Sequence, residues 1–516
     1  MKLNKWLLSL LLLIITTLSL FAPWGWLKLS LAILNLLTLS IIYGYWQEGK
    51  KQILVNLLSG YLLLFSLIVI INALLLFYWE ISYLSNLILY LIFVAGALII
   101  IKQKEIVGEI NFSWPVNFLH PTKKIVIYLL YWLIICSLII LFTQIFFHRS
   151  EQIIFSIWQI LPSNFLLFYL LLIISLFVYL TVATTGKNIA LMSILFLSSG
   201  LGVMIYRLNY GFDPFIHQAT ESIIWGQGFV TPRPIYYLGY YGIINFFQHF
   251  LSLSNVLIDR YITIINYAII LPLTINQWST IKRYHYWPAA PLFLLLLPLT
   301  TIALNTPQAL ANVLLLITIF LLLADDLRNK NYLLLLLGLT TILIHPLSGI
   351  PLIFCLLFYF YHFYVSDKTK KNLLHILSFI LLVLSPAILL VINSMLRGEQ
   401  MRLEFVTSSA QQIFANIVPG FNNFVNNFDF VYLYENWWVI LLISYFLIIT
   451  IKYRSSKYYC YGLTFLGVSC GYLILKTMIS FDFLISYEKD NYSNRLWEIG
   501  LLFLIPYLII FWLKVL

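Results

Sequence analysis

Long apolar stretches, separated by short polar segments, recur from one end of the chain to the other. Most of them approach the length of about 20 residues that an α-helix needs to cross a bilayer. Backbone groups inside lipid must pair within the protein, so apolar stretches of this length are expected to be helices. The pattern lacks the short segments of alternating polarity that a transmembrane β-barrel would show.

We therefore predict an all-α, polytopic transmembrane protein with about sixteen spans. The predicted spans cover residues 5–21, 27–45, 53–78, 82–101, 125–147, 164–184, 189–206, 258–276, 289–304, 308–324, 332–345, 349–365, 373–393, 437–451, 459–476 and 496–513. A further stretch, 235–253, is rich in Tyr and Phe but carries Gln248 and His249. We interpret it as an interfacial helix rather than a span.

The composition excludes most classes of soluble protein. Hydrophobic residues make up 62% of the 516 residues and charged residues only 9%, whereas soluble domains are roughly a quarter charged. The net charge of +11 does not predict a nucleic-acid partner, because the basic residues lie in short loops, where they orient a membrane protein. The four cysteines form no Cys-x-x-Cys pair, so we expect neither disulfides nor a metal site from them.

The distribution of basic residues predicts the orientation of the chain. With the N-terminus in the cytoplasm, 20 of the 30 Lys and Arg residues fall on the cytoplasmic side, as the positive-inside rule requires. Counting 235–253 as a span would move the basic loops that follow it to the outer side, against this rule. We expect a multi-pass plasma-membrane protein with both termini in the cytoplasm. Its long outer loops would be 148–163, 207–257, 394–436 and 477–495.

Arginine rather than lysine dominates the predicted outer side. Seven of its ten basic residues are arginines, namely Arg149, Arg207, Arg233, Arg260, Arg397, Arg402 and Arg495. Lysine suffices for orientation, whereas the planar guanidinium group offers paired donors that match phosphate oxygens. Local ion pairing explains this bias as well as an anionic, phosphate-bearing ligand does.

The outer loop after the span at 189–206 carries the candidate chemistry. Asp213 stands just beyond that span and is followed by Pro214, which suits the first turn of a helix. The four-residue spacing of His217 and Glu221 then places them on one helical face. From the residues alone, Asp213 is equally well explained as a helix N-cap.

The stretch Phe212-Asp213-Pro214-Phe215 resembles the Asp-Pro motif of oligosaccharyltransferase catalytic subunits. More broadly, the chain resembles the GT-C superfamily of integral-membrane, polyprenyl-phosphate-sugar-dependent glycosyltransferases. In that class an acidic residue of the first outer loop acts as a base or binds the acceptor side. The helix order agrees, because one predicted span precedes the Asp loop and six follow it, up to residue 393.

This resemblance implies three parts. An N-terminal membrane extension of six helices covers 1–188, a GT-C-like seven-helix module covers 189–393, and an outer loop with three spans covers 394–516. The extension has no counterpart in the simplest members of the class. The second outer loop of the module, 305–308, lacks the acidic pair of oligosaccharyltransferases, and the Trp pair at 437–438 is not followed by Asp. We therefore do not expect protein N-glycosylation.

The same resemblance adds candidates for substrate binding. Late arginines of the class hold the lipid phosphate, and Arg495 opens the last span from the outer side. A salt bridge to Glu498 is the alternative role. Arg207 and Arg233 are further candidates for phosphate oxygens. His345 interrupts an apolar run at the outer end of a span, where it either caps a helix or contacts the head group of the donor.

These features together predict an inverting membrane glycosyltransferase that uses a polyprenyl-phosphate-linked donor and an extracytoplasmic acceptor. Asp213 would take the proton of the acceptor hydroxyl, Arg495 would bind the departing phosphate, and His217 and Glu221 would orient the acceptor. The expected partners are the lipid-linked donor, a glycan, lipid or protein acceptor, and membrane lipids. The sequence requires no cofactor and leaves a divalent metal open.

Two other classes of protein compete with this interpretation. A polytopic transporter or lipid flippase would have as many spans, but charged residues inside the predicted spans are scarce, and transport pathways often carry them. An O-antigen-type polymerase or ligase would use Arg and His in outer loops without the Asp-Pro motif.

Overall fold

The computed structural model describes residues 5–49, 53–103, 121–152, 156–183, 187–208, 213–231, 236–277, 280–284, 287–296, 305–324, 331–397, 457–478 and 491–515. Within these ranges the elements are helices, and β-pairing is confined to an isolated bridge between Ser150 and Tyr206. The prediction of an all-α, polytopic membrane protein is thus confirmed for the part of the chain that the structure describes.

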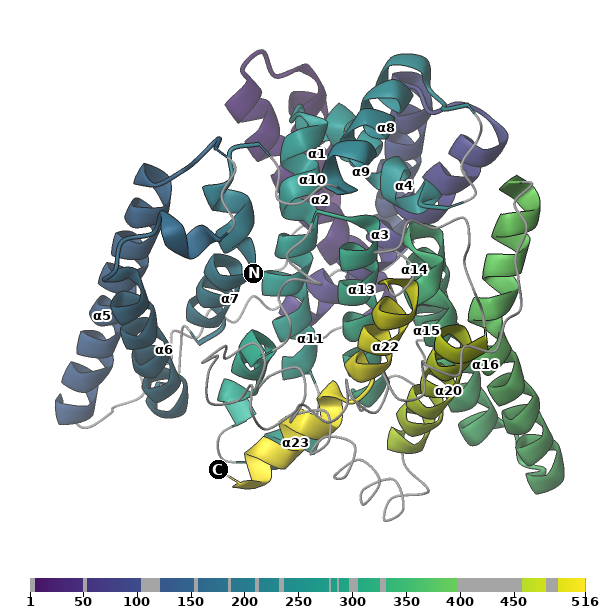
Figure 1. Ribbon diagram of the computed structural model, residues 1–516. Coiled ribbons are helices and arrows are strands. Elements are labelled where there is room, and N and C mark those ends of the chain that lie inside the picture. The colour runs from purple at the N-terminus through teal and green to yellow at the C-terminus, as the bar shows by residue number, and fades with distance from the viewer. Residues whose placement is uncertain are drawn as a thin grey trace. The chain divides into compact units, whose positions relative to one another are not determined.

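The helices follow one another in a simple order along the chain (Figure 1). They are α1 (Lys5–Phe21), α2 (Gly25–Glu48), α3 (Ile53–Tyr78), α4 (Tyr83–Gln103), α5 (Pro121–Phe147), η1 (Ile157–Gln159), α6 (Phe165–Val182), α7 (Lys187–Ile205), α8 (Asp213–Gln227), α9 (Leu238–Leu251), α10 (Asn255–Ile265), η2 (Asn266–Ile270), α11 (Leu271–Asn276), η3 (Thr280–Arg283), η4 (Trp287–Leu296), α13 (Pro307–Leu323), α14 (Asn331–Ile344), α15 (Pro346–Tyr364), α16 (Lys368–Arg397), α20 (Tyr458–Met478), α22 (Asn491–Leu502) and α23 (Ile505–Val515).

The described residues contain ten helices that are long and apolar enough to cross a membrane, or eleven if α22 and α23, bent by 45°, form one span. All of these coincide with predicted spans. Three other predicted spans, α1, α13 and α14, are apolar but shorter. The 3₁₀ helix η4 covers only the start of 289–304, and 437–451 lies outside the described residues. The predicted number of sixteen spans is therefore not confirmed.

The chain divides into two compact units, Met1–His345 and Pro346–Leu516. Their boundary falls between α14 and α15. The predicted boundaries after 188 and 393 follow the GT-C resemblance rather than contacts, and they stay predictions. In the second unit, α20 packs against α15, α16 and α22.

A close backbone contact joins α2 to α3 in the first unit. A methyl group added at Gly44 would lie 1.6 Å from the carbonyl oxygen of Asn56, and one added at Gly60 would lie 1.7 Å from that of Ser40. Small residues at four-residue spacing allow membrane helices to approach in this way. We call this contact, formed by Ser40, Gly44, Asn56 and Gly60, the α2–α3 seam.

Burial differs sharply between apolar helices of the first unit. Nearly every residue of α13 is buried, so this helix forms part of the core. In contrast, α5 and α6 lie side by side at the left of Figure 1 and keep many apolar side chains exposed, among them Leu129 and Leu167. A helix that is apolar all round belongs in a protein core or in lipid. The buried helix α13 fits the first case, and the exposed apolar faces of α5 and α6 fit the second.

The segment predicted to be an interfacial helix forms α9, whose 14 residues are too few for a span. Protein nevertheless surrounds it, because α9 packs against α3, α8, α10 and α14 and is buried on nearly all sides. Gly239 and Gly242 permit this, since a methyl group at either position would come within 2.7 Å of a side-chain atom of α3. An interfacial helix would place Tyr236, Tyr237, Tyr240, Tyr241 and Phe246 at the outer membrane surface. This expectation is corrected, because Tyr240, Tyr241 and Phe246 are buried in protein and Tyr236 and Tyr237 are partly buried.

The membrane span Asn255–Asn276 changes helix type along its length. It begins as α10, continues through the π-helix η2 and ends as α11. Pro272 lies two residues after η2. A proline inside a helix lacks an N–H group and its ring clashes with the carbonyl group four residues earlier. That residue is Ala268, within η2, so the π-helix accommodates the proline.

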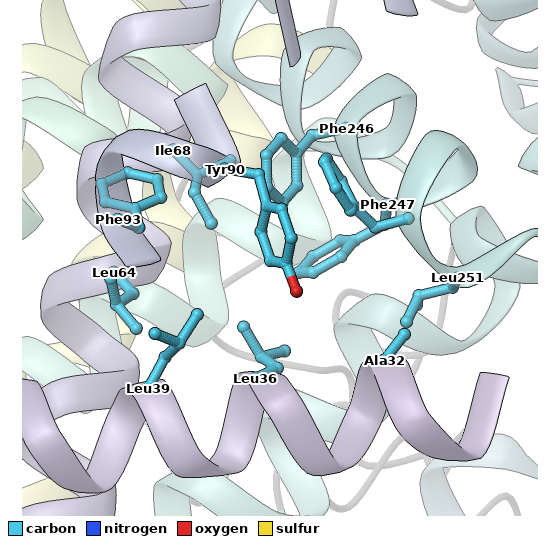
Figure 2. A pocket seen from close by; sticks show the side chains of 11 residues that line it. Ala32, Leu36, Leu39, Leu64, Ile68, Tyr90, Phe93, Phe246, Phe247 and Leu251 are labelled. Atoms are coloured by element: carbon cyan, nitrogen blue, oxygen red, sulfur yellow. The ribbon is translucent and has the colours of Figure 1, made fainter. Parts of the chain in front are cut away.

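A small apolar cavity lies between α2, α3, α4 and α9 (Figure 2). Its volume is about 20 Å³, and Tyr90 supplies the one polar side chain among the residues that line it. Ligand pockets usually measure roughly 300–1,000 Å³ and contain several polar groups. The cavity is therefore a packing gap and not a candidate site.

Candidate functional site

The helix α8 begins at Asp213, with Pro214 in its first turn, as predicted. Pro214 is buried, whereas Asp213 is partly exposed. The fixed φ of proline favours the start of a helix, and a carboxylate is stabilised by the positive end of the helix dipole. The position of Asp213 thus satisfies a structural role and leaves the residue partly exposed.

His217 lies one turn after Asp213 and faces α9. Its Nδ1 atom is 2.9 Å from the hydroxyl oxygen of Tyr241, and its ring meets those of Tyr237 and Tyr240 edge-on. Burial lowers the pKa of His217 to about 4, and the nearby carboxylate of Asp213 offsets only part of that effect. The imidazole is therefore neutral at physiological pH, when it carries both a donor and an acceptor nitrogen.

One turn further along α8, Glu221 is buried together with Asp259 of α10. Asp259 accepts hydrogen bonds from the hydroxyl group of Tyr240 and, at 3.0 Å, from Nε2 of Gln218. Glu221 accepts one from Nδ2 of Asn255 at 3.4 Å, and its Oε1 has no hydrogen-bond partner in the part of the chain described. Burial and then the charge of Asp259 raise the pKa of Glu221 well above its usual range, against the smaller opposite effect of Asn255.

We call this group of side chains the α8–α10 cluster, since it joins α8, α9 and α10. It comprises His217, Gln218, Glu221, Tyr240, Tyr241, Asn255 and Asp259. Burial, followed by the charge of Asp259, raises the pKa of Tyr240 well above its usual range. The hydroxyl group of Tyr240 therefore stays protonated and donates to Asp259.

His345 belongs to the same region. It lies between α14 and α15, as predicted, and its backbone N–H donates to the carbonyl oxygen of Thr341 at 2.8 Å. Its ring is buried and stacks on that of Tyr237 with the centroids 5.3 Å apart. Because Tyr237 also contacts His217, the structure connects two of the predicted site residues through one tyrosine ring.

Of the predicted arginines, Arg207 is the one that the structure describes in the same unit as this cluster. Arg207 is exposed and forms a salt bridge of 3.1 Å with Glu151, which is the local ion pairing that the sequence left open. Arg233 lies outside the described residues. Arg495 is partly buried on α22, in the second unit, so a cavity shared by Asp213 and Arg495 stays a prediction.

Asp259 is the principal residue that the sequence analysis missed. We predicted a span at 258–276, which placed Asp259 at the membrane edge beside Arg260. The helix in fact begins at Asn255, and Asp259 is more than one turn inside it and fully buried. Arg260 instead donates to the backbone carbonyl oxygen of Arg207. An ionisable residue within a membrane helix indicates a functional site by default, and this signal could have identified Asp259.

Across the described residues, no three His, Cys, Asp or Glu side chains lie close enough together to hold a metal ion. Comparison with family models, curated proteins and solved structures gives no match for this chain. The resemblance to GT-C glycosyltransferases therefore rests on the Asp-Pro motif, the predicted sidedness and the helix order.

Proposed function

We propose that the chain is a membrane glycosyltransferase that transfers a sugar from a polyprenyl-phosphate-linked donor to an extracytoplasmic acceptor. The observation that carries this proposal is the position of α8 between the spans α7 and Asn255–Asn276. This 15-residue helix begins at Asp213 and directs His217 and Glu221 toward α9 and α10. Titratable groups are thus gathered on two helices that are too short to span.

In the proposed reaction Asp213 accepts the proton of the acceptor hydroxyl as its oxygen attacks the anomeric carbon of the donor. The bond from that carbon to the phosphate oxygen breaks, and polyprenyl phosphate leaves with the bonding electrons. Positioned general bases typically contribute 10²–10⁴-fold. Arg495, Arg233 and Arg207 are the candidates for binding the phosphate, because guanidinium groups pair with phosphate oxygens.

The test is transfer by purified protein from a panel of polyprenyl-phosphate sugars, with Asp213→Asn as the key variant. Asparagine caps a helix about as well as aspartate, so the variant should fold normally while kcat falls at least about 100-fold. Asp367→Asn, at an exposed aspartate that accepts from the backbone N–H groups of Thr369 and Lys370 at the start of α16, is the matched control and should retain activity. Full activity of Asp213→Asn would leave Asp213 a helix cap, and absence of transfer from every donor would reject the proposed function.

The proposed sidedness has its own test. In a cysteine-free background, Leu208→Cys should react with an impermeant maleimide added to intact cells, and Lys370→Cys should react only after lysis. Labelling of residue 370 in intact cells would reverse the orientation and place α8 in the cytoplasm.

A proton-coupled transporter is the second candidate, and Asp259 favours it specifically. The sequence analysis counted few charges inside spans, yet Asp259 is fully buried within the membrane span Asn255–Asn276 beside Glu221. Such pairs occur in proton relays of transporters. Proteoliposomes containing the protein would then take up protons under an imposed gradient, and Asp259→Asn would abolish that uptake. A glycosyltransferase predicts no uptake in either protein.

A further inference from the structure

The two carboxyl groups of the α8–α10 cluster cannot both carry a charge. Glu221 and Asp259 are 2% and 0% exposed. Burying one carboxylate without a cation is already costly, and two like charges that interact in a buried site drive one of them to bind a proton. Within the described residues neither carboxyl group forms a salt bridge.

The hydrogen bonds indicate which of the two is protonated. Asp259 accepts from two groups that act here as donors, the hydroxyl of Tyr240 and the amide of Gln218, and such bonds stabilise an ionised carboxylate. Glu221 receives only the long bond from Asn255. The arrangement therefore favours a charged Asp259 and a neutral Glu221.

The other titratable groups around Glu221 agree with this assignment. On α8, His217 is neutral at physiological pH because burial lowers its pKa to about 4. On α9, Tyr240 and Tyr241 are neutral because burial raises their pKa values. On α10, Arg260 donates to the carbonyl oxygen of Arg207. Among the residues that the structure describes, no cationic side chain contacts Glu221 and stabilises its charged form.

We propose that Glu221 is a neutral carboxylic acid in the folded protein and that its O–H group donates a hydrogen bond to an uncharged oxygen of the ligand, such as a sugar hydroxyl. The nature of the ligand rests on the proposed glycosyltransferase function, whereas the protonation of Glu221 does not. Glu221 is then a residue that positions the substrate, and Asp259 is the residue that keeps it neutral.

The unpaired oxygen of Glu221 is the reason to expect a ligand. Its Oε1 is buried and has no hydrogen-bond partner among the described residues, and a buried donor without an acceptor destabilises a protein. A ligand oxygen would supply the acceptor. The rings of His217, Tyr240 and Tyr241 lie in the same cluster, and ligand sites commonly combine aromatic side chains with a few polar groups. A cation would instead require Glu221 to be ionised.

Infrared difference spectroscopy of the full-length protein tests the protonation, because a protonated carboxyl group absorbs separately from a carboxylate. The wild-type minus Glu221→Gln spectrum at pH 7 should contain the carbonyl band of a carboxylic acid. Asp259→Asn should keep that band at low pH but lose it at a lower pH than the wild type does, since the repelling charge is gone. Absence of the band from the Glu221→Gln difference, or its loss at every pH in Asp259→Asn, would overturn the assignment.

Binding of polyprenyl-phosphate mannose and polyprenyl-phosphate glucose tests the ligand. Glutamine retains a donor of similar shape, so Glu221→Gln should bind the better of the two probes nearly as well as the wild type does. Glu221→Met retains the shape without the donor and should bind about tenfold more weakly. Equal losses in both variants would show that the charged form is needed and would overturn the proposal. If the wild type binds neither probe, the ligand assignment fails together with the proposed function, whereas the spectra still decide the protonation state.

Discussion

The α2–α3 seam and the α8–α10 cluster are two helix contacts in the same unit, built on opposite principles. In the seam, Gly44 and Gly60 lack the side chains that would separate the two backbones, so the close approach depends on shape. In the cluster, Glu221 and Asp259 place carboxyl groups where burial is costly. Close packing in the seam favours stability, whereas the buried carboxyl groups of the cluster cost stability, as is common at functional sites.

A single methyl group added in the seam should cause the largest loss in the free energy of unfolding. In Gly60→Ala the new Cβ atom would lie 1.7 Å from a backbone oxygen of α2, so the helices must separate. We expect a loss of about 3 kcal/mol or more in the free energy of unfolding, at the upper end of overpacking effects. Gly226→Ala is the matched control, because nothing lies within 4 Å of its added Cβ atom. Thermal unfolding in detergent measures both, and equal stabilities would contradict the close approach.

The cluster should make the free energy of unfolding depend on pH in the acid range, through His217. The folded-state pKa of His217, about 4, lies below its ordinary value of 6.5, so as the pH falls between these values the unfolded chain takes up a proton before the folded protein does. The stability that His217 contributes is complete above pH 6.5 and lost by pH 4, on the order of 3 kcal/mol. His217→Gln should lack this loss. Parallel unfolding curves for wild type and variant between pH 7 and pH 4 would show that His217 is not buried as described.

Two adjacent tyrosines provide a finer comparison inside the cluster. Tyr240 donates to the carboxylate of Asp259, whereas Tyr241 pairs with a neutral imidazole. Hydrogen bonds to charged groups contribute about 1.5–3 kcal/mol and neutral ones about 1 kcal/mol. Tyr240→Phe should therefore destabilise the protein about twice as much as Tyr241→Phe does in chemical denaturation. The reverse order would indicate that Asp259 is the protonated carboxyl group.

The smallest effect is expected outside both contacts, at the exposed salt bridge of Arg207 with Glu151. The side chains of the two residues are 57% and 61% exposed, and pairs of this kind contribute roughly 0–1 kcal/mol. Arg207→Ala should change the unfolding temperature little. The KM for the lipid-linked donor separates the remaining alternatives, because it rises if Arg207 binds the phosphate and is unchanged if the salt bridge is its only role.

The spans and the start of α8 could be predicted because their causes are local. The length of an apolar stretch decides whether a helix can cross a bilayer, and the pair Asp213-Pro214 favours a helix start by its own backbone chemistry. The site depends on contacts between helices that lie far apart in the sequence. Tyr240 and Glu221 meet Asp259 only because α9 and α10 fold back on α8.

The two corrected expectations, for α9 and for Asp259, also depend on interactions beyond the apolar pattern of the sequence. Burial of α9 follows from Gly239 and Gly242, whose importance becomes apparent only when α3 and α14 are placed against them. Asp259 was misplaced because the start of α10 lies three residues before the predicted start of the span, and such boundaries depend on capping. Here the cap is Ser254, whose hydroxyl accepts from the backbone N–H of Leu257.

The π-helix η2 determines how α10, which carries Asp259 of the cluster, is rotated about the helix axis relative to α11. Upstream of it Asp259 faces Tyr240, and within it the hydroxyl group of Tyr267 donates to the carbonyl oxygen of Leu294 at 2.6 Å. A π turn contains one residue more than an α turn, and each residue of an α-helix advances the chain by about 100°. Deleting one residue from 266–270 would remove the extra residue of the π turn and would turn α10 by that angle relative to α11. Asp259 and α11 could then no longer both keep their present neighbours. The extra residue of η2 therefore fixes the rotation of α10 about the helix axis relative to α11.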